Sequence, residues 1–137
     1  MKSVTNKILK KLKEYGFEMT IDGNNIFIHN LLLDDIGINI NVVISNFKIK
    51  DDIYRLDFLA GPITHVVNYD SMINAVHSLN NETVFSIFSI NDNNDLIFQL
   101  HNLSREDTIA EDADFLFLII YRQIIEIYPK IMKANWQ

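Results

Sequence analysis

The sequence contains no cysteine, and this absence removes several classes of chemistry at once. Disulfide frameworks, thiolate-bound zinc or iron–sulfur centres and cysteine nucleophiles all require that side chain. Glycine is also scarce, and the four glycines form no phosphate-binding loop, dinucleotide-binding fingerprint or nucleophile elbow. The apolar run at residues 115–121 is far shorter than the about 20 residues of a membrane-spanning helix. The sequence therefore excludes thiol chemistry and a transmembrane helix, and it disfavours phosphate-handling enzymes.

The residues that are present describe one small acidic domain. The chain has 137 residues, of which 48% are apolar and 22% charged, so we expect a single domain over residues 1–137 with its own core. The formal net charge of -6 argues against nucleic acid as a partner. Residues 1–13 carry lysines without the apolar stretch of a secretory signal, so we expect a cytoplasmic protein that binds no membrane.

Three segments have the three- and four-residue spacing of apolar side chains that is typical of amphipathic helices, namely residues 4–15, 68–80 and 108–128. We expect Gly16 to end the first helix and Asn80–Asn81 the second, and Pro129 to end or kink the third. Lys130 and Lys133 suit the negative end of that third helix, and the residues beyond Pro129 are expected to form a last docked turn.

The starts of these helices also carry capping residues. Either Ser3 or Thr5 can cap the first helix, and Asn68 or Asp70 the second. Thr108 with Glu111 matches a capping box, in which the hydroxyl accepts a hydrogen bond from a backbone amide of the first turn.

Alternation of apolar and polar residues predicts six strands, at residues 17–21, 26–28, 36–45, 53–58, 84–90 and 96–100. Turn-forming residues at 22–25 and 91–95 join the first and last pairs into hairpins, residues 46–52 form a connection, and Gly61–Pro62 ends the fourth strand. The order of elements is α-β-β-β-β-α-β-β-α. The predicted fold is thus a single α+β domain of antiparallel strands, with an interrupting helix and a long C-terminal helix.

Polar residues that could carry chemistry are better interpreted as surface and turn residues. The four histidines, His29, His65, His77 and His101, contain no i, i+4 pair for a metal. Asp34–Asp35 and Asp51–Asp52 fall in predicted turns, and residues 92–95 lack the glycine and glutamate of a calcium loop. We therefore expect no metal, no cofactor and no catalysis. An enzyme stays a third hypothesis, which would need His29 and His101 to meet in space.

Apolar residues exceed what one face of a small sheet can bury. In the segment 84–90, apolar side chains fall on both faces of the predicted strand, and the final helix is apolar on more than one side. Two arrangements remain open. Either the flanking helices cover one face of the sheet and the first hairpin covers the other, or a second subunit or client protein covers part of it.

The order of elements resembles the fold shared by type III secretion chaperones and YbjN-like bacterial proteins. The resemblance spans the whole length, and its local carriers are Tyr15-Gly16-Phe17, Leu79-Asn80, the turn at residues 92–95 and the long helix from Thr108. The YbjN-like pattern usually has a glycine in that turn, where this chain has only Asn and Asp. The resemblance implies a small acidic cytosolic protein that often pairs with itself and binds another protein without catalysis.

The residues and the resemblance together predict a non-catalytic protein-binding module. It would act as a chaperone or adaptor for a client or effector, as a homodimer that uses its last helix or second hairpin. The candidate contact residues are the apolar side chains of two strands and of the last helix, Ile38, Ile40, Val42, Phe85, Phe88, Phe115 and Phe117.

A small acidic inhibitor is the alternative hypothesis, either an immunity protein or a phage counter-defence factor that neutralises a toxin or nuclease. Its contacts would come from the acidic residues around the start of the last helix, Glu106, Asp107, Glu111, Asp112 and Asp114. Placement at a helix start, where negative charge is favoured, explains the same residues without any partner.

Overall fold

The computed structural model describes residues 3–82 and 86–136. The elements are α1 (Val4–Leu12), a 3-10 turn (Lys13–Tyr15), β1 (Glu18–Asp22), β2 (Asn25–Leu33), β3 (Ile38–Lys50), β4 (Ile53–His65), α2 (Tyr69–Glu82), β5 (Ser86–Ile90), β6 (Asp95–Arg105) and α3 (Ile109–Asn135). This is the predicted order of three helices and six strands. The start of the predicted segment 84–90 lies outside the described residues.

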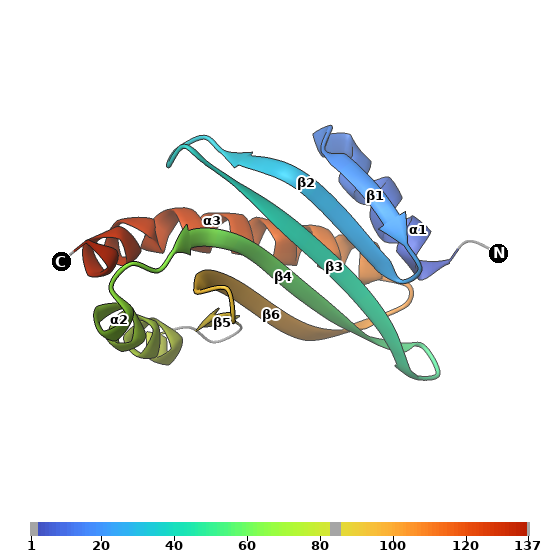
Figure 1. Cartoon of the computed structure of the whole chain (residues 1–137). Coiled ribbons are helices and arrows are strands. Elements are labelled where there is room, and N and C mark those ends of the chain that lie inside the picture. The colour runs from blue at the N-terminus through green and yellow to red at the C-terminus, as the bar shows by residue number, and fades with distance from the viewer. Residues whose placement is uncertain (1–2, 83–85, 137) are drawn as a thin grey trace.

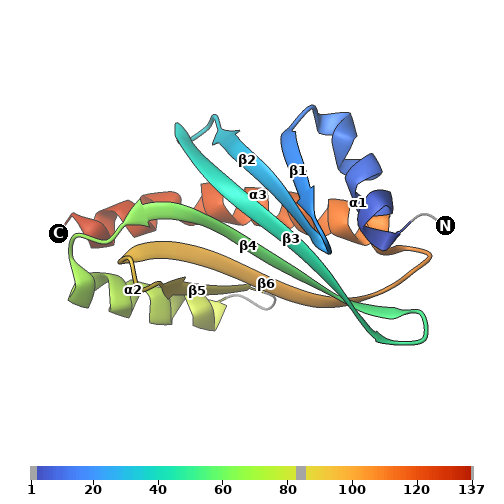
Figure 2. The ribbon, with the colours of Figure 1, turned by 45° about the vertical axis from the view of Figure 1, so that its right-hand side comes forward.

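The six strands form one antiparallel sheet in the order β1-β2-β3-β4-β6-β5. The long helix α3 runs behind the sheet, with α1 packed beside its N-terminal half and α2 beside its C-terminal half (Figures 1 and 2). The molecule thus has two layers, one of strands and one of helices.

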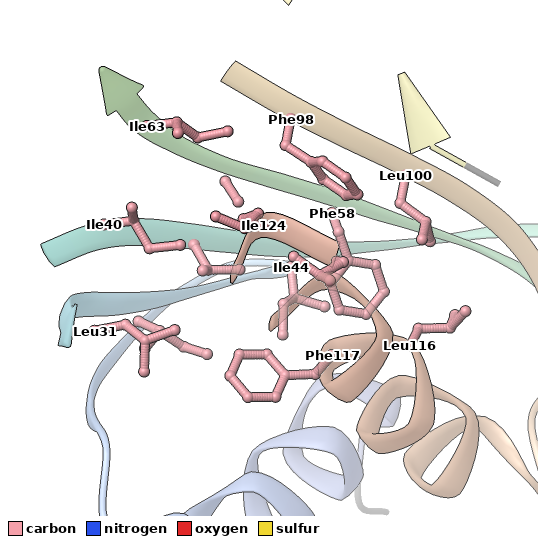
Figure 3. Packing of buried hydrophobic residues seen from close by; sticks show 14 of the residues in the cluster. Leu31, Ile40, Ile44, Phe58, Ile63, Phe98, Leu100, Leu116, Phe117 and Ile124 are labelled. Carbon is pink, nitrogen blue, oxygen red and sulfur yellow. The ribbon is translucent and has the colours of Figure 1, made fainter. Parts of the chain in front are cut away.

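The core fills the space between these two layers. Phe58 of β4 and Phe98 of β6 point from the sheet toward Leu116, Phe117 and Ile124 of α3, and all of them are buried (Figure 3). Phe88 of β5 meets Phe98 edge to face, with the ring centroids 4.8 Å apart. The period-two apolar positions of the strands and the inner stripe of α3 supply this core.

Several predicted start and stop signals are confirmed. Ser3 caps α1, because its Oγ accepts a hydrogen bond from the Asn6 amide at 3.1 Å. Asn68 caps α2 through the Ser71 amide at 3.2 Å. Gly16 ends the first helical segment with φ +77°, a left-handed conformation that favours glycine. In the turn between β5 and β6, Asn94 adopts φ +64°, so asparagine takes the place where glycine was missing.

The central hairpin is longer than predicted. β3 continues to Lys50, whereas residues 46–52 were expected to be a connection. The apolar alternation stops at Asn46, which is nevertheless buried, since its Nδ2 donates to Thr5 Oγ1 at 2.8 Å and to the Asn24 carbonyl at 3.1 Å. The second half of this strand was missed because a buried polar residue, with its hydrogen bonds satisfied, interrupts the apolar alternation.

β4 also continues past the Gly61–Pro62 pair, where it was expected to end. Its pairing with β6 shifts register between Ala60 and Thr64, so the ladder does not need the amide hydrogen that Pro62 lacks. Leu96 and Asp95 resume the pairing opposite Thr64 and His65.

α3 differs from the prediction at both ends. Thr108 makes no side-chain cap, and its hydroxyl donates to Asp112 Oδ2 at 3.1 Å. Pro129 does not end the helix, which continues to Asn135, so the expected separate last turn is part of α3. Ile131 and Asn135 are buried beyond the proline, and their burial compensates for the hydrogen bond that Pro129 cannot donate.

Candidate partner-binding surface

The sheet face opposite the helices, here called the open face, is not covered by any described helix (Figures 1 and 2). The first hairpin was considered as a cover for this face, but β2 pairs with β3 and β1 pairs with β2, so the hairpin extends the sheet. Of the two arrangements left open by the sequence, the one in which the first hairpin covers the second face is therefore wrong. The side chains that alternate with the core residues of the strands therefore face solvent here.

An apolar row crosses the open face from strand to strand. Its members are opposite one another in the ladder, and they are Phe27, Val43, Leu59, Gln99 and Ile87. Leu59 is 40% exposed and Ile87 49% exposed. Only Gln99 interrupts the apolar character of the row. Such a row is a surface that another protein can cover with favourable free energy.

A polar row runs beside this apolar row. Ser45 Oγ donates to Asn25 Oδ1 at 2.6 Å, and the next position across the sheet is Asp57. Arg55 donates to Asp57 Oδ2 at 2.7 Å, and His101 Nδ1 lies 2.8 Å from Asp57 Oδ1. The carboxylate of Asp57 is thus held between two groups, which fixes its orientation at the centre of the open face.

A third row mixes an aromatic ring, a charge and an apolar side chain. The Arg55 guanidinium lies over the Phe47 ring, 5.0 Å from its centroid. Leu103, opposite Arg55 on β6, is 63% exposed. Aromatic and arginine side chains are enriched at the centres of protein interfaces, and the exposed Leu103 adds apolar area beside them.

A second apolar surface lies on α3. Phe115 is 65% exposed and Leu118 42% exposed, and Tyr121 and Ile125 continue the stripe half-buried. A groove along this stripe reaches Asp35 in the loop between β2 and β3. The sequence expectation that the final helix is apolar on more than one face is therefore confirmed.

The structure separates the predicted contact residues into three groups. Ile40, Val42, Phe88 and Phe117 are buried in the core, so their side chains cannot reach a partner, and we remove them from the candidate surface. They were selected because apolar character alone does not reveal which face of a strand or helix is inside. Ile38 is half-buried and Phe115 is exposed, while Phe85 lies outside the described residues.

The open-face residues that sequence reasoning missed had a detectable signal. Phe27, Val43, Leu59 and Leu103 are apolar at positions that alternate with core residues of the same strand. An ordinary solvent-facing row would be polar there. The signal for this surface was a strand with apolar residues on both faces. The helices can cover only one of these faces, so the apolar residues of the other face stay available.

The two edges of the sheet differ. At the β5 edge, the Asn80 side chain of α2 pairs with the Phe88 backbone, accepting from its amide at 2.7 Å and donating to its carbonyl at 2.9 Å. This amide occupies the groups that an added strand would use. β1 is the other edge, and its exposed acidic ends, Glu18 and Asp22, discourage pairing between copies.

Three of the five predicted acidic contact residues already accept hydrogen bonds within the domain. Glu106 accepts from the Tyr54 hydroxyl, Asp112 from Ser104 and Thr108, and Asp114 from the Tyr15 hydroxyl. These contacts connect the start of α3 to the sheet and to α1. Asp107 and Glu111 have no such partner among the described residues, so they are the free acidic groups at this end.

The hydrogen bond from Tyr15 to Asp114 raises the pKa of the Tyr15 phenol to about 12, and partial burial and the negative charges of Asp114 and Glu14 act in the same direction. Partial burial, together with the hydrogen bond to Glu106, raises the pKa of the Tyr54 phenol. Both shifts follow from phenols that are held in their neutral, donating form beside carboxylates.

The predicted reactive groups do not gather. His29 on β2 and His101 on β6 are separated by β3 and β4, so they do not meet, and His29 instead lies 2.8 Å from Thr20 Oγ1. Within residues 3–82 and 86–136, no three His, Asp or Glu side chains are arranged to hold a metal ion. Asp34–Asp35 and Asp51–Asp52 lie in turns, as predicted.

Comparison with solved structures shows what this fold is similar to. YbjN from E. coli, described as a proposed transcription regulator, aligns over 91% of this chain and 91% of its own with a TM-score of 0.52 and 10% identity. A protein from Methanothermobacter thermautotrophicus aligns over 97% of this chain and 99% of its own, with a TM-score of 0.49 and 13% identity.

No family model and no curated protein matches the sequence. The structural similarity confirms the predicted YbjN-like α+β fold, while the resemblance to secretion chaperones stays a prediction. None of the helices in the described part of the chain combines the length and apolar character that a bilayer crossing requires.

Proposed function

We propose that this YbjN-like domain is a non-catalytic protein-binding module, which acts in the cytoplasm as a chaperone or adaptor for a partner protein. The observation that carries the proposal is the open face, where a row of apolar side chains crosses the sheet without a covering layer. Burial of this row would stabilise a complex by about 25 cal/mol for each Å² of apolar area removed from water.

Two further observations support a binding role. His29 lies beside Thr20 and His101 beside Asp57, and no three His, Asp or Glu side chains among the described residues are arranged to hold a metal ion. YbjN, which is similar in fold, is described as a proposed transcription regulator, and a regulatory role is consistent with a binding module. The partner is a client or effector protein.

Two leucines of similar exposure test which surface binds. Leu59 on the open face is 40% exposed and Leu118 on α3 is 42% exposed. We expect Leu59→Gln to weaken capture of the partner from the native cell about five- to thirtyfold, the size of a contact of 1–2 kcal/mol, and Leu118→Gln to leave it unchanged. Quantitative mass spectrometry of proteins retained on the tagged domain measures both variants.

The proposal fails if the tagged domain enriches no protein over a tag-only control. It also fails if the Leu59→Gln variant captures the enriched protein as well as the wild type does. If only the Leu118→Gln variant lost capture of the partner, the interface would lie on α3 instead. Circular dichroism of each variant confirms that the fold is intact.

Self-association is the second part of the proposal, with the α3 stripe or the second hairpin as the contact. Light scattering at micromolar concentration is expected to give about twice the 16.0 kDa of one chain. A species of single-chain mass that binds no apolar dye would contradict it.

For the acidic-inhibitor alternative, only two of the five predicted contact residues, Asp107 and Glu111, have carboxylates that accept no hydrogen bond within the described residues. A charge-driven complex of this kind should associate much more slowly at high salt, since screening shortens the range of electrostatic attraction. We expect the association rate of the captured partner to change little between about 50 and 500 mM NaCl. A steep fall that Glu111→Gln reduces would favour the inhibitor.

A further inference from the structure

A pocket that belongs to neither apolar surface lies at the end of the molecule where β4 passes into α2 and α3 ends. Figures 1 and 2 show the C-terminal end of α3 beside the start of α2. The pocket is a shallow depression that is wide open to solvent, with a volume of about 420 Å³, and it is lined by Val67, Asn68, Tyr69, Asp70, Asn135 and Trp136. It therefore joins a loop, a helix start and a helix end that are distant in sequence.

The base of this pocket is held in place by Asn135, which is only 1% exposed. Its Oδ1 accepts from the amides of Val67 and Asn68 at 2.7 and 3.3 Å, and its Nδ2 donates to the His65 carbonyl at 2.9 Å. One buried amide thus connects α3 to the segment before α2. The lining side chains are consequently presented from a fixed backbone.

The walls combine aromatic rings with a carboxylate. Trp136, the only tryptophan of the chain, is 67% exposed, and Tyr69 is 54% exposed. Asp70 is exposed and has no hydrogen-bond or ion-pair partner among the described residues. None of the lining residues carries a positive charge.

The pocket lies between the negative, C-terminal end of α3 and the N-terminal end of α2, whose positive charge the Asp70 carboxylate offsets. The groups that line it together favour a cation. The faces of tryptophan and tyrosine rings attract cations through the ring quadrupole, and a carboxylate beside them adds a direct charge contact. An anion would be repelled by Asp70, and a purely apolar group would cover that carboxylate without pairing it. The net charge of -6 also attracts a cation to the molecule.

We infer that this pocket binds a positively charged side chain, lysine or arginine, of a partner protein. The inference rests on the proposed protein-binding function in one respect, namely that the positively charged side chain belongs to a partner protein. Binding of a cation in the pocket does not depend on that function, because the pocket is separate from the open face. The pocket would supply specificity for a basic position in a partner whose apolar residues cover the open face.

The lone tryptophan gives a direct readout, because its indole N–H is the only such group in a nitrogen–proton correlation spectrum. We expect N-acetyl-lysine methylamide and N-acetyl-arginine methylamide to shift this signal saturably, with apparent Kd values in the millimolar range. N-acetyl-norleucine methylamide, which has a neutral side chain, is expected to leave the signal unchanged.

Asp70→Asn tests the carboxylate and is expected to raise the apparent Kd about two- to fivefold, the range of a solvent-exposed ion pair. Asp51→Asn, which removes an exposed carboxylate in the turn between β3 and β4, is the matched control and should titrate as the wild type does.

An equal response to the norleucine probe, or no effect of Asp70→Asn, would overturn the inference. A shift with tetramethylammonium but not with the lysine and arginine probes would overturn the side-chain assignment. None of these outcomes depends on Leu59, so failure here and failure of the open face as an interface are distinguishable.

Discussion

Three asparagines act inside this protein as substitutes for backbone groups. Asn46 connects β3 to α1, Asn80 pairs with the β5 edge, and Asn135 joins α3 to the segment before α2. In sequence, asparagine is typical of turns and helix ends, and Asn80 was interpreted in that way. The side-chain amide carries one donor group and one acceptor, so it can equally satisfy a buried backbone pair.

The removal of such an amide should be costly where it is buried. We expect Asn135→Ala to lower the free energy of unfolding by about 2–4 kcal/mol, because two backbone amides and a carbonyl lose their partner. Asn74→Ala, at an exposed position of α2, should change it by less than about 0.5 kcal/mol. Urea denaturation followed by circular dichroism measures the free energy of unfolding of both variants. Equal values would show that the hydrogen bonds of Asn135 contribute nothing to stability.

Tyr15 makes stability depend on alkaline pH. Its pKa is raised from 10.0 to about 12 in the folded protein, chiefly by the hydrogen bond to Asp114. A folded-state pKa above the unfolded one stabilises the fold fully below pH 10, and this contribution is lost as the pH rises to about 12.

Tyr15→Phe isolates this contribution. Since Tyr15 is 42% exposed, we expect the variant to be less stable at pH 8 by under about 1 kcal/mol. The difference should shrink as the pH rises from 9 to 11, because the wild type alone loses the interaction. Tyr54 is present in both proteins, so its own shift cancels. Urea midpoints at each pH give the result, and a constant difference would contradict it.

At the scale of elements, α3 uses opposite sides of one turn for two different purposes. Phe117 is 2% exposed and contacts the rings of Phe17 and Tyr15, while Phe115, two residues earlier, is 65% exposed. Both positions belong to one unbroken apolar run, so only the rotation of the helix against the sheet distinguishes them.

Alanine substitutions at these two positions should therefore differ strongly. We expect Phe117→Ala to lower the free energy of unfolding by about 3–5 kcal/mol, as for other buried aromatic residues. Phe115→Ala should stay within about 0.5 kcal/mol, as for other surface positions. Thermal unfolding of both variants tests this. A large loss for Phe115→Ala would mean that its ring is covered in solution.

The β5 edge gives a second prediction for an element. Asn80→Ala frees the Phe88 amide and carbonyl, so we expect a loss of about 1–3 kcal/mol. Asn81→Ala, the exposed neighbour on α2, is the control. Concentration-dependent light scattering should also show that Asn80→Ala, unlike the wild type and Asn81→Ala, assembles beyond a dimer, because the opened edge can pair with another strand. If the variant stays monodisperse and stable, Asn80 does not protect the edge.

At the scale of the whole molecule, a sheet with helices on one side has a graded stability. β4 lies at the centre between β3 and β6, whereas β1 and β5 are edges. We expect amide hydrogen exchange to be slowest in β4 and its two neighbours and fastest in β1, because an edge strand opens without the rest of the sheet. Mass spectrometry of exchange in the intact protein measures this order, which equal protection of β1 and β4 would refute.

Local signals in the sequence determined the elements and their order. Period-two and period-3.6 apolar spacing, Ser3, Asn68 and Gly16 depend only on neighbouring residues, so the α+β fold could be predicted. The ends of β3, β4 and α3 could not be predicted, because they depend on residues that are distant in sequence. These dependences are the hydrogen bonds of Asn46, the register shift after Ala60 and the burial of Ile131.

Which of the apolar residues face outward was decided by the tertiary structure. An apolar residue on a strand is equally suited to the core or to an interface, and the placement of all three helices on one face determined that Val42 is buried and Leu59 is exposed. The same packing brought Trp136 to Tyr69 and Asp70, which no spacing in the sequence relates. Local chemistry specifies which segments form; the long-range burial of one face specifies which side chains remain available to a partner.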